Sequence, residues 1–280
     1  MAAIRVVSDS ASDLPPALVE EHRIKVVPLT IRFGDEELFD RQDLTPREFW
    51  ARCASSPVLP ETAAPAPGAF QAAFEQAADE GSTGVVCVCL SSFLSATYQS
   101  ALTGAQAVAD RIPVRVVDSR SLTMGQGLMV LSAARMAAEG KGIDDVAGAV
   151  EDLIPRTRIF AALDTLENLK KGGRIGNAQA LLGSLLSIKP IIEVVGGRVE
   201  AESRQRTRSR SLQYLVVKLG QLGQIEDLAM MHGDAPDAEE FLDMLGRVYP
   251  RDEILVGDIG AVIGTHSGPR AIGITFHVPR

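Results

Sequence analysis

The chain has 280 residues, a net charge of −8 and a mean hydropathy of +0.10, with 46% hydrophobic residues. This apolar content excludes intrinsic disorder, and no apolar run approaches the roughly 18 residues that a membrane-spanning helix needs. Three cysteines are too few for a disulfide framework, and the chain reaches the polar turn Ser8-Asp9-Ser10 too soon for a signal peptide, so we expect a cytoplasmic globular protein.

The first half of the chain alternates apolar segments with amphipathic ones. Strands are predicted at 4–7, 25–31, 84–90 and 114–117, and helices after Pro15-Pro16, after the capping box at 45–48, around 70–78, and over 98–109, 125–139 and 143–154. The segment GVVCVCL at 84–90 is apolar on both faces, which is typical of a central parallel strand. Strand, polar loop and helix in repetition predict a mainly parallel sheet flanked by helices, with ligands at the carboxyl ends of the strands.

A boundary between two α/β domains, 1–155 and 156–280, is predicted at Pro155. Beyond it, the pattern predicts strands at 159–163, 188–195, 198–201 and 228–231, two closing strands, and helices at 165–171, 176–187, 208–222 and 237–248. The Gly196-Gly197 pair is typical of a hairpin turn. The second domain is therefore expected to be a mixed sheet with helices.

Charge is unevenly distributed along the chain. Residues 156–218 hold 12 Lys and Arg against five Asp and Glu, a local charge of +7, so that the rest of the chain carries −15. A basic zone in an acidic protein indicates a surface for an anion or an acidic partner. Solvated helix faces would give the same count, so this pattern alone leaves both interpretations open.

Standard signatures of cofactor binding and catalysis are missing from the sequence. It has no P-loop, no G-x-G-x-x-G after the first strand and no G-x-S-x-G elbow. Cys87 and Cys89 would share one face of a strand, but no histidine or third cysteine lies near them, and the four histidines show no ligand spacing. We therefore expect neither a metal site nor a cofactor.

Polar residues follow the strongest predicted strand. The segment Ser91-Ser92-Phe93-Leu94-Ser95-Ala96-Thr97-Tyr98 lies where that strand meets a helix. Hydroxyls and free backbone amides at a helix N-terminus would suit a carboxylate or a phosphate. Ser95 could equally be an ordinary helix cap, and the two roles are compatible. Thr62, in the loop after Pro60, offers one more hydroxyl.

Two further segments combine glycine with a cationic or imidazole side chain. Gly172-Gly173-Arg174-Ile175-Gly176 allows close backbone approach and supplies the planar donor fork of Arg174, although a helix C-cap explains it as well. The segment Gly264-Thr265-His266-Ser267-Gly268-Pro269 predicts a polar loop between apolar strands. His266 could donate to an anion there, or face solvent as a turn residue.

Taken together, these segments resemble the DegV family, whose members include the fatty-acid-binding subunits of bacterial fatty acid kinases. The resemblance runs nearly from end to end. The segments that carry it are VVSDSASDLP, PETAAPAPGAF, LSSFLSATYQSA, VDSRSLTMGQGL, LENLKKGGRIGNAQALLGSLLSIKPII, RTRS and IGTHSGPRAIGI. It implies a two-domain α/β protein that holds one long-chain fatty acid in a tunnel between or within its domains.

The resemblance also implies which residues bind the ligand. Matching positions put Thr62 and the serine-rich loop at the fatty acid carboxylate, with Ser91, Ser92 and above all Ser95 as contacts. His266 would contribute to the same polar network.

The same resemblance implies a protein partner. Arg174 and Arg206 match basic residues that face the catalytic subunit in the kinase-linked members. That subunit phosphorylates the bound fatty acid to an acyl phosphate, so the chain itself would be a carrier without catalytic activity. No cofactor, nucleic acid or stable membrane insertion is implied.

Four residues depart from the usual family pattern near the expected carboxylate. Ala63 and Ala64 replace a serine and a glutamine, which removes a hydroxyl and an amide. Phe93 and Ala96 replace glycines, which could take positive φ where larger residues rarely do. These changes bear on the identity of the ligand more than on the fold.

Two alternative functions follow from the residues themselves. An enzyme, either a hydrolase or a transferase acting on a carboxylated or phosphorylated metabolite, could use Ser95 as nucleophile and His266 as base. A DNA-binding regulator could use the arginines that alternate from Arg204 to Arg210, but the net charge of −8 and the lack of interleaved aromatic residues disfavour it.

Overall fold

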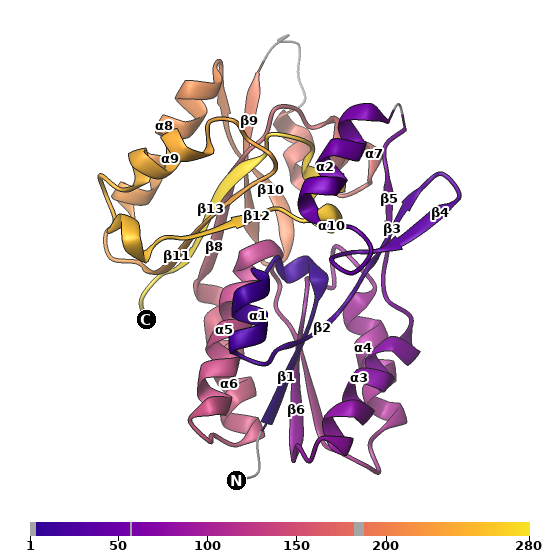
Figure 1. The fold of residues 1–280 in the computed structure, drawn as a ribbon. Coiled ribbons are helices and arrows are strands. Elements are labelled where there is room, and N and C mark those ends of the chain that lie inside the picture. The colour runs from indigo at the N-terminus through magenta and orange to yellow at the C-terminus, as the bar shows by residue number, and fades with distance from the viewer. Residues whose placement is uncertain (1–3, 57, 182–187) are drawn as a thin grey trace.

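The computed structural model describes residues 4–56, 58–181 and 188–280, and its first sheet is fully parallel (Figure 1). Its strand order is β2-β1-β6-β7, with β1 at Ile4–Asp9, β2 at Lys25–Val27, β6 at Gly84–Cys89 and β7 at Val114–Asp118. Every residue of β6 is buried, as its apolar sequence predicted. The predicted parallel sheet flanked by helices is confirmed.

Helices cover both faces of this sheet. The chain connects the strands through α1 (Pro16–Glu21), α3 (Pro67–Asp79), α4 (Thr97–Ala107), α5 (Thr123–Ala138) and α6 (Ile143–Leu153). Val86 and Val88 belong to the core with α5 and α6, whereas Val85 and Cys87 belong to the core with α3 and α4. The two cores follow from the period of two along a strand, because alternate side chains of β6 point to opposite faces.

A second, mixed sheet of six strands is built entirely from the second half of the chain. Its order is β10-β9-β8-β13-β11-β12, with β8 at Thr157–Ala162, β9 at Lys189–Val195, β10 at Arg198–Gln205, β11 at Glu226–His232, β12 at Leu255–Asp258 and β13 at Ile272–His277. Only β11 and β12 pair in parallel. The predicted hairpin turn is confirmed, since Gly196 and Gly197 both have positive φ between β9 and β10.

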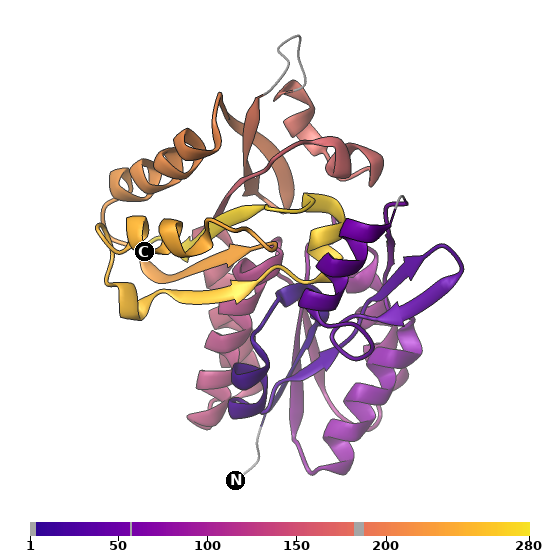
Figure 2. The ribbon, with the colours of Figure 1, turned by 45° about the horizontal axis from the view of Figure 1, so that its top comes forward.

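One face of the six-stranded sheet packs against two helices, α8 (Arg208–Gln221) and α9 (Ala238–Leu245), which lie together on one side of it (Figures 1 and 2). Phe160, Ile274 and Phe276 on this face share a core with Leu215 and Phe241 of the helices. The alternate residues of the same strands point to the opposite face, which turns toward the first half of the chain.

The predicted strand at 25–31 is wrong in one respect, because it is two strands in two different sheets. β2 ends at Val27, and β3 (Thr30–Phe33) pairs with β4 (Glu36–Phe39) and β5 (Glu61–Ala63) in a separate antiparallel sheet. Pro28 explains the break, since it lacks the backbone N–H that a continuous ladder needs. The sequence pattern did not predict β4 and β5.

The predicted polar loop at 264–269 is also wrong, because most of it belongs to a helix, α10 (Ala261–Ser267). Ala261, Val262 and Thr265 lie on its buried side, and the Thr265 hydroxyl donates to the Ala261 carbonyl one turn earlier (2.8 Å). The hydroxyl that suggested a loop is thus satisfied inside the helix.

Residues far away in the sequence hold α10 in place. The Gly260 N–H donates to the buried Asp13 carboxylate (2.9 Å), which also pairs with Arg41 (2.9 Å). The Trp50 indole N–H, on α2 (Pro46–Ser55), donates to the Ile259 carbonyl (3.1 Å). α2 begins at the predicted capping box. The start of α10 is therefore fixed by the first half of the chain.

The remaining elements are short. α7 spans Glu167–Lys171, and the 3₁₀ segments are Ser10–Ser12, Ile154–Arg156, Gly176–Leu181 and Arg251–Glu253. The predicted helix at 176–187 thus begins as a 3₁₀ turn, and its residues 182–187 lie outside the described part of the chain. No helix that the structure describes is long and apolar enough to cross a bilayer. The domain boundary at 155 stays a prediction.

A glycine on α10 offers a test of this packing. A Cβ added at Gly264 would lie 2.7 Å from Phe49 and from Trp50, whereas one added at Gly148, on α6, would meet nothing within 4 Å. We expect Gly264→Ala to lower the free energy of unfolding by about 1–3 kcal/mol through overpacking. Gly148→Ala should raise it by about 0.5–1 kcal/mol through helix propensity. Urea unfolding of both variants checks this, and two stabilised variants would contradict the close contact.

Candidate ligand-binding site

An apolar cavity of about 220 Å³ lies on the inner face of the six-stranded sheet. Ile159, Ala161, Ile192, Val194 and Thr275 line it, and they alternate along β8, β9 and β13 with residues that pack against α8 and α9. The outer face of this sheet is therefore covered by helices, while part of its inner face borders this partly open cavity.

The carboxyl ends of the first sheet form the opposite wall. Leu90 follows β6, Leu94 lies in the next loop, and Leu122 and Thr123 lie at the start of α5. This is the edge where ligands were expected from the parallel strand order. α10 and the three-stranded sheet close the remaining side with Val262, Ile263, His266, Thr62 and neighbouring residues.

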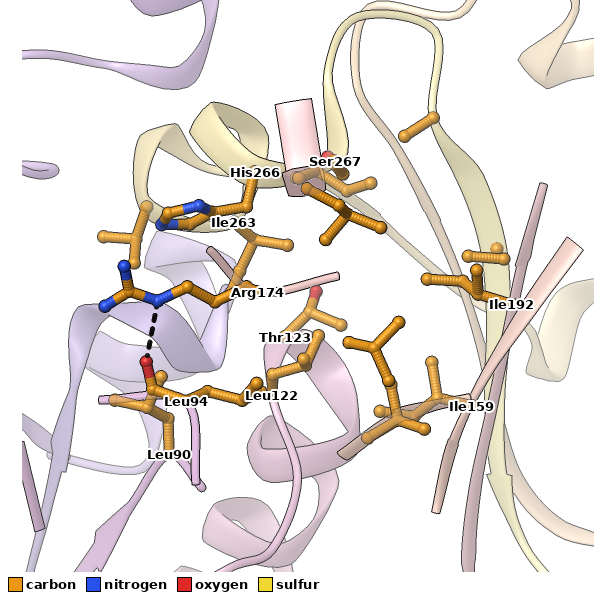
Figure 3. Close-up of a pocket in the computed structure, with 18 of the residues that line it drawn as sticks. Leu90, Leu94, Leu122, Thr123, Ile159, Arg174, Ile192, Ile263, His266 and Ser267 are labelled. Atoms are coloured by element: carbon orange, nitrogen blue, oxygen red, sulfur yellow. Dashed lines mark hydrogen bonds between the residues drawn. The ribbon is translucent and has the colours of Figure 1, made fainter. Parts of the chain in front are cut away.

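The charged and imidazole side chains of the lining, Arg174 and His266, lie on one side of the cavity. Figure 3 shows His266 and Arg174 there, beside Leu94, with Ile159 and Ile192 on the far side. The Thr62 hydroxyl and the His266 Nε2 atom are 3.0 Å apart. Ser95 follows Leu94 in the lining. Thr62, Ser95 and His266 come from three distant segments, and the structure brings all three to the same cavity.

His266 is neutral in this setting. Burial, and secondly the charge of Arg174, lower the pKa of His266 to about 4. Its Nδ1 atom has no hydrogen-bond partner among residues 4–56, 58–181 and 188–280, and Gly172 leaves room for it, because a Cβ at Gly172 would lie 2.3 Å from that nitrogen. A neutral imidazole can donate one hydrogen bond and accept another.

Arg174 brings a positive charge to the cavity wall. Its Nε donates to the Leu94 carbonyl (3.1 Å) and its Nη1 to the Gly172 carbonyl (2.7 Å). No acidic side chain in the described part of the chain forms an ion pair with it, so its charge is offset only by carbonyl dipoles. The resemblance implies that Arg174 faces a partner, which stays a prediction, and the structure also places Arg174 in the lining.

Ser91 and Ser92 lie beside the cavity but do not line it. The buried Ser91 hydroxyl donates to the Gly197 carbonyl (2.8 Å) and so ties the loop after β6 to the hairpin turn of the second sheet. The Ser92 hydroxyl donates to Asp118 (2.6 Å) at the end of β7. Both hydroxyls therefore stabilise the loop that carries Ser95.

Ser95 precedes the N-cap of α4, which is Ala96, so Ser95 is not the cap residue itself, and its role as a ligand contact stays a prediction. It lines the cavity, and its Oγ accepts the Thr97 N–H (3.3 Å) and lies 2.9 Å from the Thr97 hydroxyl. Ala96 also lines the cavity, and neither it nor Phe93 has a positive φ. Replacing glycine at these positions thus creates no backbone strain.

The alternating arginines do not form one exposed row. Arg208 pairs with Asp237, and Arg204 donates to the Ala180 carbonyl. Arg206 is exposed and forms no ion pair with any residue that the structure describes. Because Arg204 and Arg208 already interact with other groups of the protein, the arrangement does not favour the DNA-binding alternative.

Nor does the geometry favour the enzyme alternative. Ser95 and His266 form hydrogen bonds with Thr97 and Thr62 respectively, and no hydrogen bond joins the two as nucleophile and base. Within the described ranges, no group of three or more His, Cys, Asp or Glu side chains could hold a metal ion. The site is suited to holding an apolar molecule with a polar end.

Comparison with known proteins identifies the family. A model described as "Uncharacterised protein, DegV family" matches residues 3–278. A DegV domain-containing protein from Streptomyces coelicolor is 35% identical over 275 residues, covering 97% of each chain. The chain belongs to the DegV family.

Solved structures of the DegV family agree with this fold. A fatty-acid-binding DegV family protein from Thermus thermophilus has a TM-score of 0.91 and 32% identity, covering 99% of this chain and all of the other. DegV of Bacillus subtilis, a fatty acid binding protein, has a TM-score of 0.88 and 28% identity, covering 100% of both chains. A stearic-acid-binding protein from Eubacterium ventriosum has a TM-score of 0.87 and 26% identity, with coverage of 99% and 98%.

Two buried hydroxyls of the lining were not predicted from the sequence. Thr123 and Thr275 both line the cavity, and neither hydroxyl has a hydrogen-bond partner among the residues that the structure describes. The alternation of strand residues could have indicated two sheet faces, but not which face would enclose a cavity.

We expect the His266 imidazole of the ligand-free protein to titrate near pH 4. The measurement is an NMR titration, with the signal assigned by its loss in His266→Gln. Because the folded pKa lies below the unfolded value of about 6.5, His266 favours the folded state above that pH, and this contribution is lost as the pH falls toward 4. A midpoint near 6.5 would contradict the burial of His266. His277, whose pKa burial also lowers to about 4, gives a second signal for comparison.

Proposed function

We propose that this protein binds one long-chain fatty acid in the cavity, with the carboxylate beside Thr62, Ser95 and His266, and presents it to a partner kinase. The observation that carries the proposal is an apolar cavity with its charged and imidazole groups on one side. The DegV neighbours that bind fatty acids, including stearic acid, support the same ligand class.

The apolar lining favours the acyl chain. A chain of about 16 carbons gains on the order of 0.8 kcal/mol per buried methylene, or about 12 kcal/mol before the costs of association. The lining that would contact it is aliphatic, with leucine, isoleucine, valine and alanine from both halves of the chain. Because the wall combines two sheets, the proposed ligand would contact both of them.

The polar side favours a carboxylate. A buried carboxylate without hydrogen-bond donors is costly, and here the Thr62 and Ser95 hydroxyls and the neutral His266 imidazole offer donors. Arg174 adds a guanidinium whose charge no acidic side chain of the described residues offsets. A carboxylate in this position would supply the missing negative charge.

The proposed partner is the catalytic subunit of a fatty acid kinase. Arg206 is exposed, and Arg174 reaches from the cavity wall toward the loop of Leu94, so Arg206 is accessible to a partner and Arg174 lies beside the proposed carboxylate. In this proposal the kinase supplies the phosphoryl group, and the carrier, with no cofactor, only positions the acceptor oxygen. Transfer would convert the carboxylate into an acyl phosphate.

Ligand binding is tested first. Protein denatured after purification should release a fatty acid detectable by mass spectrometry, and delipidated protein should bind palmitate in a titration. Thr62→Val keeps the side-chain shape but removes the hydroxyl, so palmitate affinity should fall about tenfold. Thr103→Val, at an exposed position of α4, is the matched control and should leave affinity unchanged. Protein that never contains or binds a fatty acid would refute the proposal.

Presentation to the kinase is tested separately. With a fatty acid kinase catalytic subunit and ATP, the loaded protein should yield acyl phosphate, which hydroxylamine traps as a hydroxamate. Arg206→Ala should reduce the initial rate about tenfold at subsaturating carrier, because one charged contact with the partner is lost. Arg210→Ala, an exposed arginine on α8, serves as the control. Equal rates for both variants would argue against Arg206 in docking.

A further inference from the structure

A second, smaller pocket of about 180 Å³ lies next to the main cavity. The residues that line it are Phe93, Leu94, Gly173, Arg174, Gly176, Asn177, Arg198 and Val199. Three of them, Leu94, Arg174 and Val199, line the main cavity as well. The two spaces thus share one wall, and that wall is on the side where the carboxylate is proposed to lie.

The smaller pocket carries two guanidinium groups without acidic partners. Neither Arg174 nor Arg198 forms an ion pair with an acidic side chain of residues 4–56, 58–181 or 188–280. Nearby Arg120 differs, because Asp118 holds it at 2.8 Å. Two positive charges that no acid offsets favour an anion between or beside them.

Phe93 holds one of these charges in position. The Arg198 guanidinium lies over the Phe93 ring, 3.7 Å from its centroid, and Arg120 lies 4.4 Å from the same centroid. Stacking on an aromatic face limits the freedom of an otherwise exposed arginine, so less entropy is lost when it binds an anion. A glycine at this position, as the resemblance to the family would give, could not supply this stacking ring.

The other polar side chain of the pocket is already engaged. The Asn177 amide donates one hydrogen bond to the Glu200 carboxylate (2.8 Å), so the positively charged donors of the pocket are those of the two arginines. Arg174 donates one hydrogen bond from Nε and one from Nη1 to carbonyl oxygens, which leaves one Nη1 hydrogen and both Nη2 hydrogens. This donor set is planar, doubly charged and suited to a group with several equivalent oxygens.

We propose that this pocket binds the phosphoryl group of an acyl phosphate whose chain lies in the main cavity. The inference rests on the proposed function. In the transfer, a carboxylate oxygen forms a bond to the terminal phosphorus of a nucleoside triphosphate held by the kinase. The bond from that phosphorus to its bridging oxygen breaks, and the nucleoside diphosphate leaves with the electron pair.

Charge and position together select a phosphoryl group. It is attached directly to the carboxylate oxygen, so it must extend one bond beyond the carboxylate. The smaller pocket is the space next to this position, because it shares Leu94 and Arg174 with the main cavity. A phosphoryl group brings close to two negative charges at neutral pH, whereas a carboxylate brings one. The carrier would thereby retain the reactive product until another enzyme consumes it.

The test uses the β-ketophosphonate analogue of palmitoyl phosphate, in which a methylene replaces the bridging oxygen and prevents hydrolysis. Titration of delipidated protein compares this analogue with palmitate. Arg198→Ala should weaken binding of the analogue by about tenfold or more and change palmitate affinity less than twofold. Arg198→Lys should recover part of the loss, because it keeps the charge without the planar fork.

Two control variants distinguish the charge of Arg198 from the loss of any exposed arginine and from the stacking on Phe93. Arg210→Ala removes an exposed arginine remote from both cavities and should leave both affinities unchanged. Phe93→Leu removes the stacking ring but keeps both guanidinium groups, so it should weaken the analogue by less than Arg198→Ala does.

Each outcome has one meaning. Equal loss of analogue and palmitate in Arg198→Ala would overturn the phosphoryl site, since Arg198 would then support the cavity as a whole. Unchanged binding of the analogue would overturn it too. Failure of the unmodified protein to bind palmitate would instead refute the proposed function, so the two failures are distinguishable.

Discussion

The six-stranded sheet has two apolar faces, and only one of them is covered by helices α8 and α9. The constraint on the rest of the structure is that the other face must also be removed from water. Helix α5 contacts β8, β11 and β13 there, and the carboxyl edge of the parallel sheet approaches beside it. The cavity is the space left between them, and its aliphatic lining follows from that constraint.

Three polar side chains enter this apolar space from segments that are distant in the sequence. α10 brings His266, the three-stranded sheet brings Thr62, and the loop after β6 brings Ser95. The buried Asp13 and the indole of Trp50 fix the start of α10 through Gly260 and Ile259, so the position of His266 depends on residues about 210 to 250 places earlier. The neutral state of His266 is a consequence of the same burial.

Arg174 links the cavity to the protein surface. Its bond to the Leu94 carbonyl joins the second half of the chain to the first, and its charge also lowers the pKa of His266. A single guanidinium therefore acts on the buried imidazole and borders the outer pocket. This position would let a mostly apolar site favour an anion, although the chain as a whole has a net charge of −8.

The sequence by itself determined those elements that depend on the pattern of neighbouring residues. The buried strand β6, the capping box of α2 and the Gly196-Gly197 turn depend on neighbouring residues, and the family followed from motifs in chain order. Only the tertiary structure decided which sheet face encloses the cavity, that 264–267 are helical, and that Arg174 lines the site while Ser91 and Ser92 support its loop. These features depend on contacts between segments up to about 250 residues apart, and no local periodicity encodes which segments will meet.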